Sequence, residues 1–191
     1  MVNGQERLAQ QSRDWLVTAL FDLLGEQPYE TITVKQIAEK AQLSRRTFYR
    51  AFRDKDDLLD YYDREVGQRY LTALQQITPQ KMVFKEVLTY FFTFWWEERQ
   101  QIRLLIKQGL FSRMLAKITP MASEIYRVFP APWHIAGSPT ETDYIMSFAA
   151  GGFWNVLNQW LVHEHPESPA EMATLLMAGL KQLGESGDSG H

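Results

Sequence analysis

The sequence contains no cysteine among its 191 residues, which excludes disulfide bonds and thiolate metal sites. It also lacks a long apolar run. The aromatic cluster at residues 90–96 ends at Glu97, and it is far shorter than the roughly 20 apolar residues that a membrane-spanning helix needs. Residues 1–14 lack the apolar core of a signal peptide. These absences predict a cytoplasmic protein with no membrane partner.

The motifs of catalysis are missing as well. The chain has no P-loop, no nucleophile motif and no glycine-rich dinucleotide turn. His163 and His165 are two residues apart and so point from different faces of a helix, unlike the i, i+4 pair of a zinc site. His134 stands in a loop with no evident partner. We therefore expect no enzyme activity, no cofactor and no metal ion.

An excess of basic charge is absent from the chain as a whole but present in one stretch. The net charge is −3, and the composition, 45% apolar and 13% aromatic, is that of a globular protein. Between residues 33 and 55, seven basic residues face two acidic ones (Lys35, Lys40, Arg45, Arg46, Arg50, Arg53 and Lys55 against Glu39 and Asp54). Such a concentration is typical of a nucleic-acid footprint, although the solvated face of an ordinary helix pair is the alternative.

The same stretch predicts two short helices joined by a tight turn. In the first, an apolar stripe recurs at helical spacing (Val34, Ile37, Ala38 and Ala41), and Thr33 with Gln36 forms a capping box. Ser44 can cap the second helix, in which Phe48 and Phe52 point back at the first.

The opposite face of the second helix carries arginines, a hydroxyl and a tyrosine. Arginine can bond guanine O6 and N7 in the major groove, whereas Ser, Thr, Tyr and helix N-termini can hold phosphates. We therefore predict a helix-turn-helix that binds double-stranded DNA. Its predicted contact residues are Thr33, Ser44, Arg45, Arg46, Thr47, Tyr49 and Arg50.

Residues 33–59 read Thr-Val-x-x-Ile-Ala-x-x-Ala-x-Leu-Ser-Arg-x-Thr-Phe-Tyr-Arg-x-Phe-x-Asp-Lys-x-x-Leu-Leu. This pattern resembles the N-terminal DNA-binding signature of the TetR (tetracycline repressor) family of bacterial transcription regulators. The resemblance implies that Lys55 touches a DNA phosphate. Many members carry glycine where this chain has Gln42; if the backbone there is left-handed, glutamine costs about 1 kcal/mol.

The remaining chain predicts an all-α fold of about nine helices, with a three-helix N-terminal domain and a C-terminal helical bundle. The expected domains are residues 1–62 for DNA binding, with the fourth helix continuing as a linker, and 63–184 for ligand binding and dimerisation. Residues 185–191 are expected to be a disordered tail. Predicted helices beyond the DNA-binding part cover about 54–77, 81–96, 99–107, 110–129, 141–163 and 168–183, with a kink or break at Pro120.

The last two helices predict a homodimer. Two interior glycines at 151 and 152 each cost about 1 kcal/mol relative to alanine, and close approach of a neighbouring backbone would offset that cost. The predicted interface residues are Phe148, Gly152, Asn155, Val156, Gln159, Met172, Leu176 and Leu180. The alternative is that both helices belong to the monomer core. A dimer should read a pseudo-palindromic operator.

TetR-like proteins commonly release DNA, or bind it differently, when a ligand enters the second domain. The predicted effector-pocket residues are Phe91, Trp95, Phe111, Met114, Tyr126, Phe129 and Trp133. The alternative is that these side chains fill the core and leave no cavity.

The first functional prediction is a repressor that a small apolar ligand releases from its operator. Trp160-Leu161 with residues 167–172 is similar to a TetR subgroup whose C-terminal region looks like that of dihydroxyacetone-kinase operon activators. That similarity implies a second possibility, an activator or co-regulator controlled by a protein partner. A third possibility is a helical interaction module that does not bind DNA.

Overall fold

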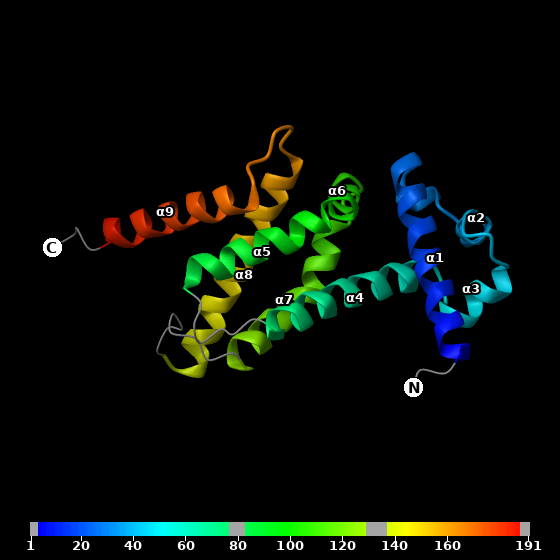
Figure 1. The fold of residues 1–191 in the computed structure, drawn as a ribbon, viewed down its shortest axis with the longest axis horizontal. Coiled ribbons are helices and arrows are strands. Elements are labelled where there is room, and N and C mark those ends of the chain that lie inside the picture. The colour runs from blue at the N-terminus through cyan, green and yellow to red at the C-terminus, as the bar shows by residue number, and fades with distance from the viewer. Residues whose placement is uncertain (1–3, 77–82, 129–136, 188–191) are drawn as a thin grey trace. The chain divides into compact units, whose positions relative to one another are not determined.

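A computed structural model describes residues 4–76, 83–128 and 137–187, and these ranges contain helices and no strand. Nine α-helices and one 3-10 helix follow one another along the described chain (Figure 1). Their bounds are α1 Gly4–Glu26, η1 (the 3-10 helix) Tyr29–Thr31, α2 Val34–Lys40, α3 Arg45–Ala51, α4 Lys55–Gln76, α5 Phe84–Glu97, α6 Arg99–Lys107, α7 Phe111–Val128, α8 Pro139–Val162 and α9 Pro169–Gly187. The predicted all-α fold is thereby confirmed. None of the described helices meets the length and apolarity that crossing a membrane requires.

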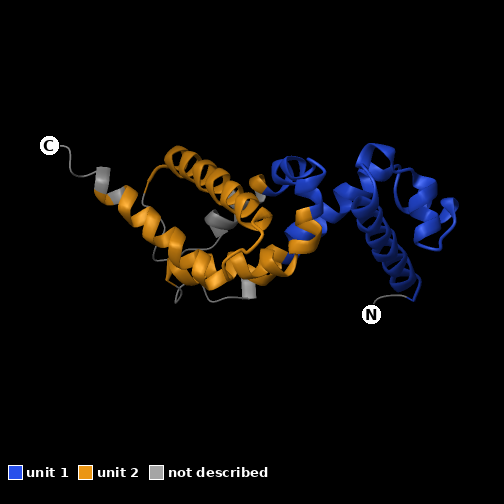
Figure 2. Cartoon of the chain, turned by 90° about the horizontal axis from the view of Figure 1, so that it is seen from above, with its two compact units in different colours: residues 1–69, 104–118 blue, residues 70–103, 119–191 orange. Residues whose placement is uncertain are grey.

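The chain divides into two compact units (Figure 2). Unit 1 comprises residues 1–69 together with 104–118, and unit 2 comprises residues 70–103 and 119–191. Residues 104–118, which fall inside the range 63–184 expected for the second domain, cluster with the N-terminal residues in unit 1. Segments far apart in the sequence therefore meet in unit 1.

The core of unit 1 is built on α1 and α4. Leu16, Leu20 and Leu24 are fully buried and recur every four residues, so one face of α1 is covered along its C-terminal half. Phe21 meets Tyr62 of α4 edge to face, with ring centroids 4.5 Å apart. Because α2 and α3 both contact α1, this core is the platform on which the two short helices rest.

Unit 2 has an aromatic core. Helix α5 lies along α9 and also contacts α8 (Figure 1). The ring centroids of Trp95 and Trp154 are 5.0 Å apart, and those of Phe92 and Trp160 are 5.3 Å apart. The Trp160 indole donates a hydrogen bond to the carbonyl of Glu167 at 3.0 Å, which satisfies its buried polar atom.

Helices α7 and α9 differ from the predictions. Helix α7 runs through Pro120 without a break, and Pro120 is exposed, so the missing backbone hydrogen bond faces solvent. Helix α9 continues past Leu183 to Gly187, where Lys181 and Glu185 pair one turn apart at 3.6 Å and support the last turn. The end of the predicted tail, residues 188–191, lies outside the described residues.

Candidate nucleic-acid interface

Helix α2 is fixed at its start by the predicted capping box. The hydroxyl of Thr33 accepts a hydrogen bond from the backbone N–H of Gln36 at 3.3 Å, and the Gln36 side chain accepts from the backbone N–H of Thr33 at 2.9 Å. Ile37 and Ala38 are buried beneath the helix. The short helix is therefore held by its cap and by its apolar face.

The turn between α2 and α3 contains a left-handed residue. Gln42 has φ 56°, a conformation that favours glycine, and it is the only non-glycine residue with positive φ in the described chain. The backbone N–H of Leu43 donates to the carbonyl of Ala38 at 2.8 Å, closing the end of α2. The backbone at Gln42 is thus left-handed, which is the case in which glutamine costs about 1 kcal/mol relative to glycine.

Helix α3 is capped and pinned as its sequence predicts. Ser44 accepts a hydrogen bond from the backbone N–H of Thr47 at 3.0 Å. Phe48 is fully buried and Phe52 is 5% exposed, so the helix is anchored on one side. Its other side is exposed at Arg45, Arg46 and Arg50.

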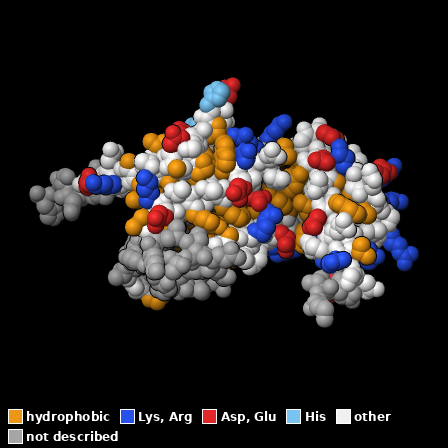
Figure 3. All heavy atoms as spheres, in the orientation of Figure 1, with side chains coloured by type: hydrophobic (Ala, Val, Ile, Leu, Met, Phe, Trp, Pro, Cys, Tyr) orange, Lys and Arg blue, Asp and Glu red, His pale blue; other side chains and the backbone are white. Residues whose placement is uncertain are grey.

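The other predicted contact residues are a tyrosine and three residues with hydroxyl groups. Tyr49 is 58% exposed, and its ring packs edge to face on Phe48 with centroids 5.6 Å apart. Thr33 and Ser44 are exposed at the two helix starts, and Thr47 is half-buried. Figure 3 shows basic side chains gathered at the edge of the molecule where Figure 1 places α2 and α3.

Ion pairs decide which basic residues remain available. Lys40 pairs with Glu26 at 2.6 Å, and Arg53 pairs with Asp57 at 3.3 Å. A longer contact of 3.9 Å joins Lys35 to Glu39.

Within the part of the chain that the structure describes, no carboxylate pairs with Arg45, Arg46 or Arg50. The unpaired positive charge of the basic stretch is therefore concentrated on α3.

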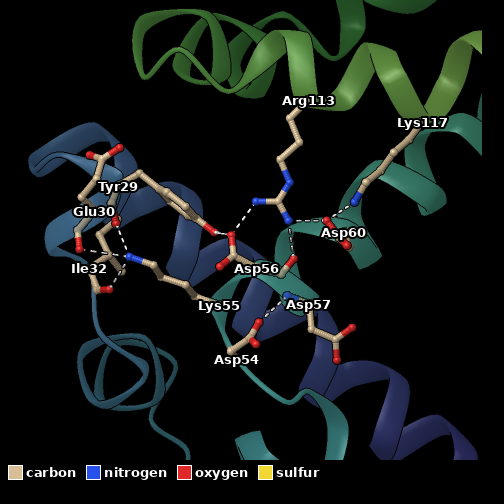
Figure 4. A network of polar contacts seen from close by, with 10 residues as sticks. All are labelled: Tyr29, Glu30, Ile32, Asp54, Lys55, Asp56, Asp57, Asp60, Arg113 and Lys117. Atoms are coloured by element: carbon tan, nitrogen blue, oxygen red, sulfur yellow. Dashed lines mark hydrogen bonds and ion pairs between the residues drawn. The ribbon is translucent and has the colours of Figure 1, made fainter.

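The side chain of the seventh basic residue, Lys55, is hydrogen-bonded to backbone carbonyl groups. Its Nζ donates to the carbonyl oxygens of Tyr29 at 2.6 Å, Glu30 at 3.1 Å and Ile32 at 3.0 Å (Figure 4). It also lies 4.4 Å from the centroid of the Tyr29 ring. These partners could not be predicted from the sequence, because they depend on where the turn after α1 meets the start of α4.

A network of ionic side chains joins α4 to α7 within unit 1 (Figure 4). Arg113 donates to the carboxylate of Asp56 at 2.5 Å and to its backbone carbonyl at 3.0 Å, and it also pairs with Asp60. Lys117 pairs with the same Asp60. Sequence reasoning missed this network, although its acids and bases each recur one helical turn apart.

The network shifts the pKa values of its acids. Partial burial opposes ionisation of Asp56 and Asp60, but hydrogen bonds from Tyr29 and Arg113 to Asp56, and from Lys117 and Arg113 to Asp60, lower both pKa values. Burial disfavours the charged form of Arg113, but the hydrogen bonds that it donates to Asp56 and Asp60 outweigh this effect and raise its pKa.

The predicted effector residues divide between the units. Phe91 and Trp95 are buried in unit 2, whereas Phe111 and Met114 are buried in unit 1. The side chain of Tyr126, and Phe129 and Trp133 altogether, lie outside the described residues. The aromatic side chains of unit 2 pack on one another, with Trp95 close to Tyr70 at 5.7 Å between centroids. The pocket stays a prediction.

The predicted dimer residues lie on the surface of the single chain. Phe148 is 80% exposed, Gly152, Asn155 and Gln159 are exposed, and Val156 is half-buried. On α9, Leu180 is 37% exposed, and Met172 and Leu176 are half-buried.

Two protein-family models and a bacterial relative match this chain. The family model described as "Bacterial regulatory proteins, tetR family" matches residues 16–62, and one described as "Transcriptional regulator C-terminal region" matches residues 83–182. The uncharacterized HTH-type transcriptional regulator YxbF of Bacillus subtilis (strain 168) is 25% identical over 156 residues, which cover 79% of this chain and 40% of YxbF. The chain thus spans less than half of that relative.

Two solved structures share the fold. A TetR transcriptional regulator from Streptococcus agalactiae 2603V superimposes with TM-score 0.62 and 18% identity, covering 90% of this chain and 94% of that one. The dihydroxyacetone kinase operon activator DhaS superimposes with TM-score 0.55 and 15% identity, covering 90% and 95%. With family models matching both the helix-turn-helix and the C-terminal half, the chain belongs to the TetR family of bacterial transcriptional regulators.

Proposed function

We propose that α3 enters the major groove of an operator and that Arg45, Arg46 and Arg50 supply its base and phosphate contacts. The observation that carries this proposal is the set of three arginines left without an ion-pair partner among the described residues. An unpaired guanidinium can bond guanine bidentately, whereas a paired one would first have to leave its carboxylate. Ser44, Thr47, Tyr49 and the capped start of α2 at Thr33 would hold phosphates.

A series of DNA-binding measurements tests this proposal. Fragments of the source genome that the protein retains would first be selected, and the binding of a selected duplex and a scrambled duplex compared by fluorescence anisotropy. Arg45→Ala or Arg46→Ala should cost about 1–3 kcal/mol of discrimination if that arginine reads a base. Lys85→Ala, an exposed lysine of α5 in unit 2, is the control. Equal binding of both duplexes by the wild type would contradict the proposal.

We further propose that the protein acts as a homodimer through α8 and α9. Tyr144, Phe148 and Val162 form an exposed apolar stripe on α8, with exposed fractions of 74%, 80% and 56%, and Leu175 and Leu183 extend a similar one on α9. A Cβ atom added at Gly151 or Gly152 would meet nothing within 4 Å in the single chain. Apolar surface and small residues left open together favour a close helix contact with a second copy.

The dimer would present two α3 helices to a pseudo-palindromic operator. Phe148→Glu should convert the protein to monomers in analytical ultracentrifugation and weaken operator binding, because a charge cannot be buried unpaired in an apolar interface. Lys85→Glu is the charge-changing control. A wild type that sediments as a monomer at micromolar concentration would contradict this arrangement.

Repression in the cytoplasm, relieved by a small apolar ligand in unit 2, is the regulatory mode we propose. The buried Trp95 indole supports it, because its N–H has no hydrogen-bond acceptor among the described residues. A ligand of aromatic or aliphatic character that carries a carbonyl oxygen would satisfy that donor. Titration of the tryptophan fluorescence with such ligands, alongside a promoter reporter, tests both the ligand and the sign of regulation. Ligand-independent activation of the reporter would instead favour a mode like that named for DhaS.

A further inference from the structure

The side chain of Lys55 has all its hydrogen-bonding capacity in use. An ammonium group carries three N–H donors, and three carbonyl oxygens lie 2.6, 3.1 and 3.0 Å from Nζ. The face of the Tyr29 ring, 4.4 Å away, adds a cation–π contact on a further side. A DNA phosphate would have to displace one of these partners to bind Nζ.

The three carbonyls belong to the turn that precedes α2. Tyr29 and Glu30 lie in η1, and Ile32 stands directly before Thr33, the N-cap of α2. Lys55 is the first residue of α4. Its side chain therefore ties together the two ends of the segment 33–55, which carries the residues proposed to contact DNA.

Neighbouring contacts make the turn a firm anchor. The hydroxyl of Tyr29 donates to Asp56 at 2.8 Å, and Arg113 holds the same carboxylate at 2.5 Å. Gln108 accepts from the backbone N–H of Tyr29 at 3.1 Å and donates to the carbonyl of Leu24 at 2.8 Å. The turn is thus held by contacts from α4 and from residues 104–118. Among these, the Lys55 side chain contacts Ile32, the last residue of the turn before the N-cap of α2.

We propose that Lys55 is a positioning residue, which clamps the start of α2 to the start of α4 so that α3 is held in register for base contacts, and that it makes no phosphate contact through its side chain. This inference rests on the proposed DNA-binding function and replaces the role that family resemblance implied for Lys55. In this role, DNA binding depends on the arrangement of the Lys55 hydrogen bonds and not on the charge of the side chain. Arginine, whose planar guanidinium cannot converge on three carbonyls, should not substitute for it.

The experiment compares Lys55→Met and Lys55→Arg with the wild type, and Lys85→Met serves as a matched surface control. Each protein is titrated into a selected genomic duplex and into a scrambled duplex over a range of salt concentrations. Thermal unfolding confirms that all are folded at the temperature of measurement. Amide hydrogen exchange over residues 33–43 reports on α2 and the turn without DNA.

Both Lys55 variants should lose roughly tenfold or more in affinity for the selected duplex, as expected from hydrogen bonds to a charged group. Their affinity for the scrambled duplex and the slope of log K against log salt should match the wild type. Their amides in residues 33–43 should exchange faster, and Lys85→Met should change none of these quantities.

A phosphate contact would give a different pattern. Lys55→Met would then lower the salt slope by about 0.9 per protomer and weaken both duplexes alike, and Lys55→Arg would behave as the wild type. That pattern, or unchanged exchange and affinity in Lys55→Met, overturns the proposal. If the wild type itself does not distinguish the duplexes, DNA reading fails, and hydrogen exchange still decides whether Lys55 clamps α2.

Discussion

Asp63 makes the stability of unit 1 depend on pH in an unusual direction. Its side chain is 1% exposed, and neither carboxylate oxygen has a hydrogen-bond partner in the described part of the chain. Burial raises its pKa from 3.8 to about 7, although Lys117 and Arg113 on α7 oppose the rise. Asp60 on its own helix adds to it, and Arg64 opposes it. The neutral acid is therefore the form that suits the folded state.

The sign and size of the effect follow from the two pKa values. Between about pH 4 and pH 7 the unfolded chain has released this proton while the folded chain retains it, so the free energy of unfolding falls by about 1.4 kcal/mol per pH unit. The loss reaches at most about 4 kcal/mol above pH 7. Asp63→Asn cannot ionise and should remove this loss.

Urea unfolding of wild type and Asp63→Asn, followed by far-ultraviolet circular dichroism at several pH values, measures the difference. The free energy of unfolding of the variant should rise relative to that of the wild type between about pH 4 and pH 7. Above pH 7 the difference should stay constant. Asp60→Asn is the control of opposite sign, because the lowered pKa of Asp60 contributes stability above about pH 4 that disappears in acid. Parallel stability curves for Asp63→Asn and wild type across this window would show that Asp63 does not carry a raised pKa in the folded protein.

Three further predictions concern other parts of the chain. Gln42→Gly should raise the free energy of unfolding by about 1 kcal/mol in urea titrations, because φ 56° costs glutamine but not glycine; an unchanged or lower value would contradict it. Arg113→Met should destabilise the protein by about 2 kcal/mol near neutral pH, since it removes the charge-assisted hydrogen bonds to Asp56 and Asp60, and the penalty should vanish in acid as both are protonated. Gly152→Ala should stabilise the helix by about 1 kcal/mol if the site stays open, but in a tight dimer it should instead weaken self-association in sedimentation experiments.

Local chemistry explains why the helix-turn-helix could be predicted closely. The caps at Thr33 and Ser44 and the strained turn at Gln42 each involve residues within five positions of one another, so the sequence contains both partners. The buried positions Phe48 and Phe52 follow from helical spacing in the same way.

Long-range contacts explain what could not be predicted. Lys55 and Arg113 are ordinary basic residues in the sequence, and nothing near them in the chain identifies their partners. The carbonyls that hold Lys55 come from residues 23 to 26 positions earlier, and the acids that hold Arg113 from residues 53 and 57 positions earlier. Likewise, the charges of Arg113 and Lys117 that act on Asp63 lie in the distant segment 104–118.

That a capped helix pair with a buried apolar face displays a cluster of cations is evident from the amino-acid order, because helix spacing, capping and the i, i+4 pair of Arg53 with Asp57 involve neighbouring residues. Which of the other cations have partners depends on the folded chain. Lys55 is held by the carbonyls of a distant turn and Lys40 by the carboxylate of Glu26, whereas Arg45, Arg46 and Arg50 stay exposed. An ionic group pairs with the nearest opposite charge or dipole in space, and the packing of the whole unit sets which groups are near.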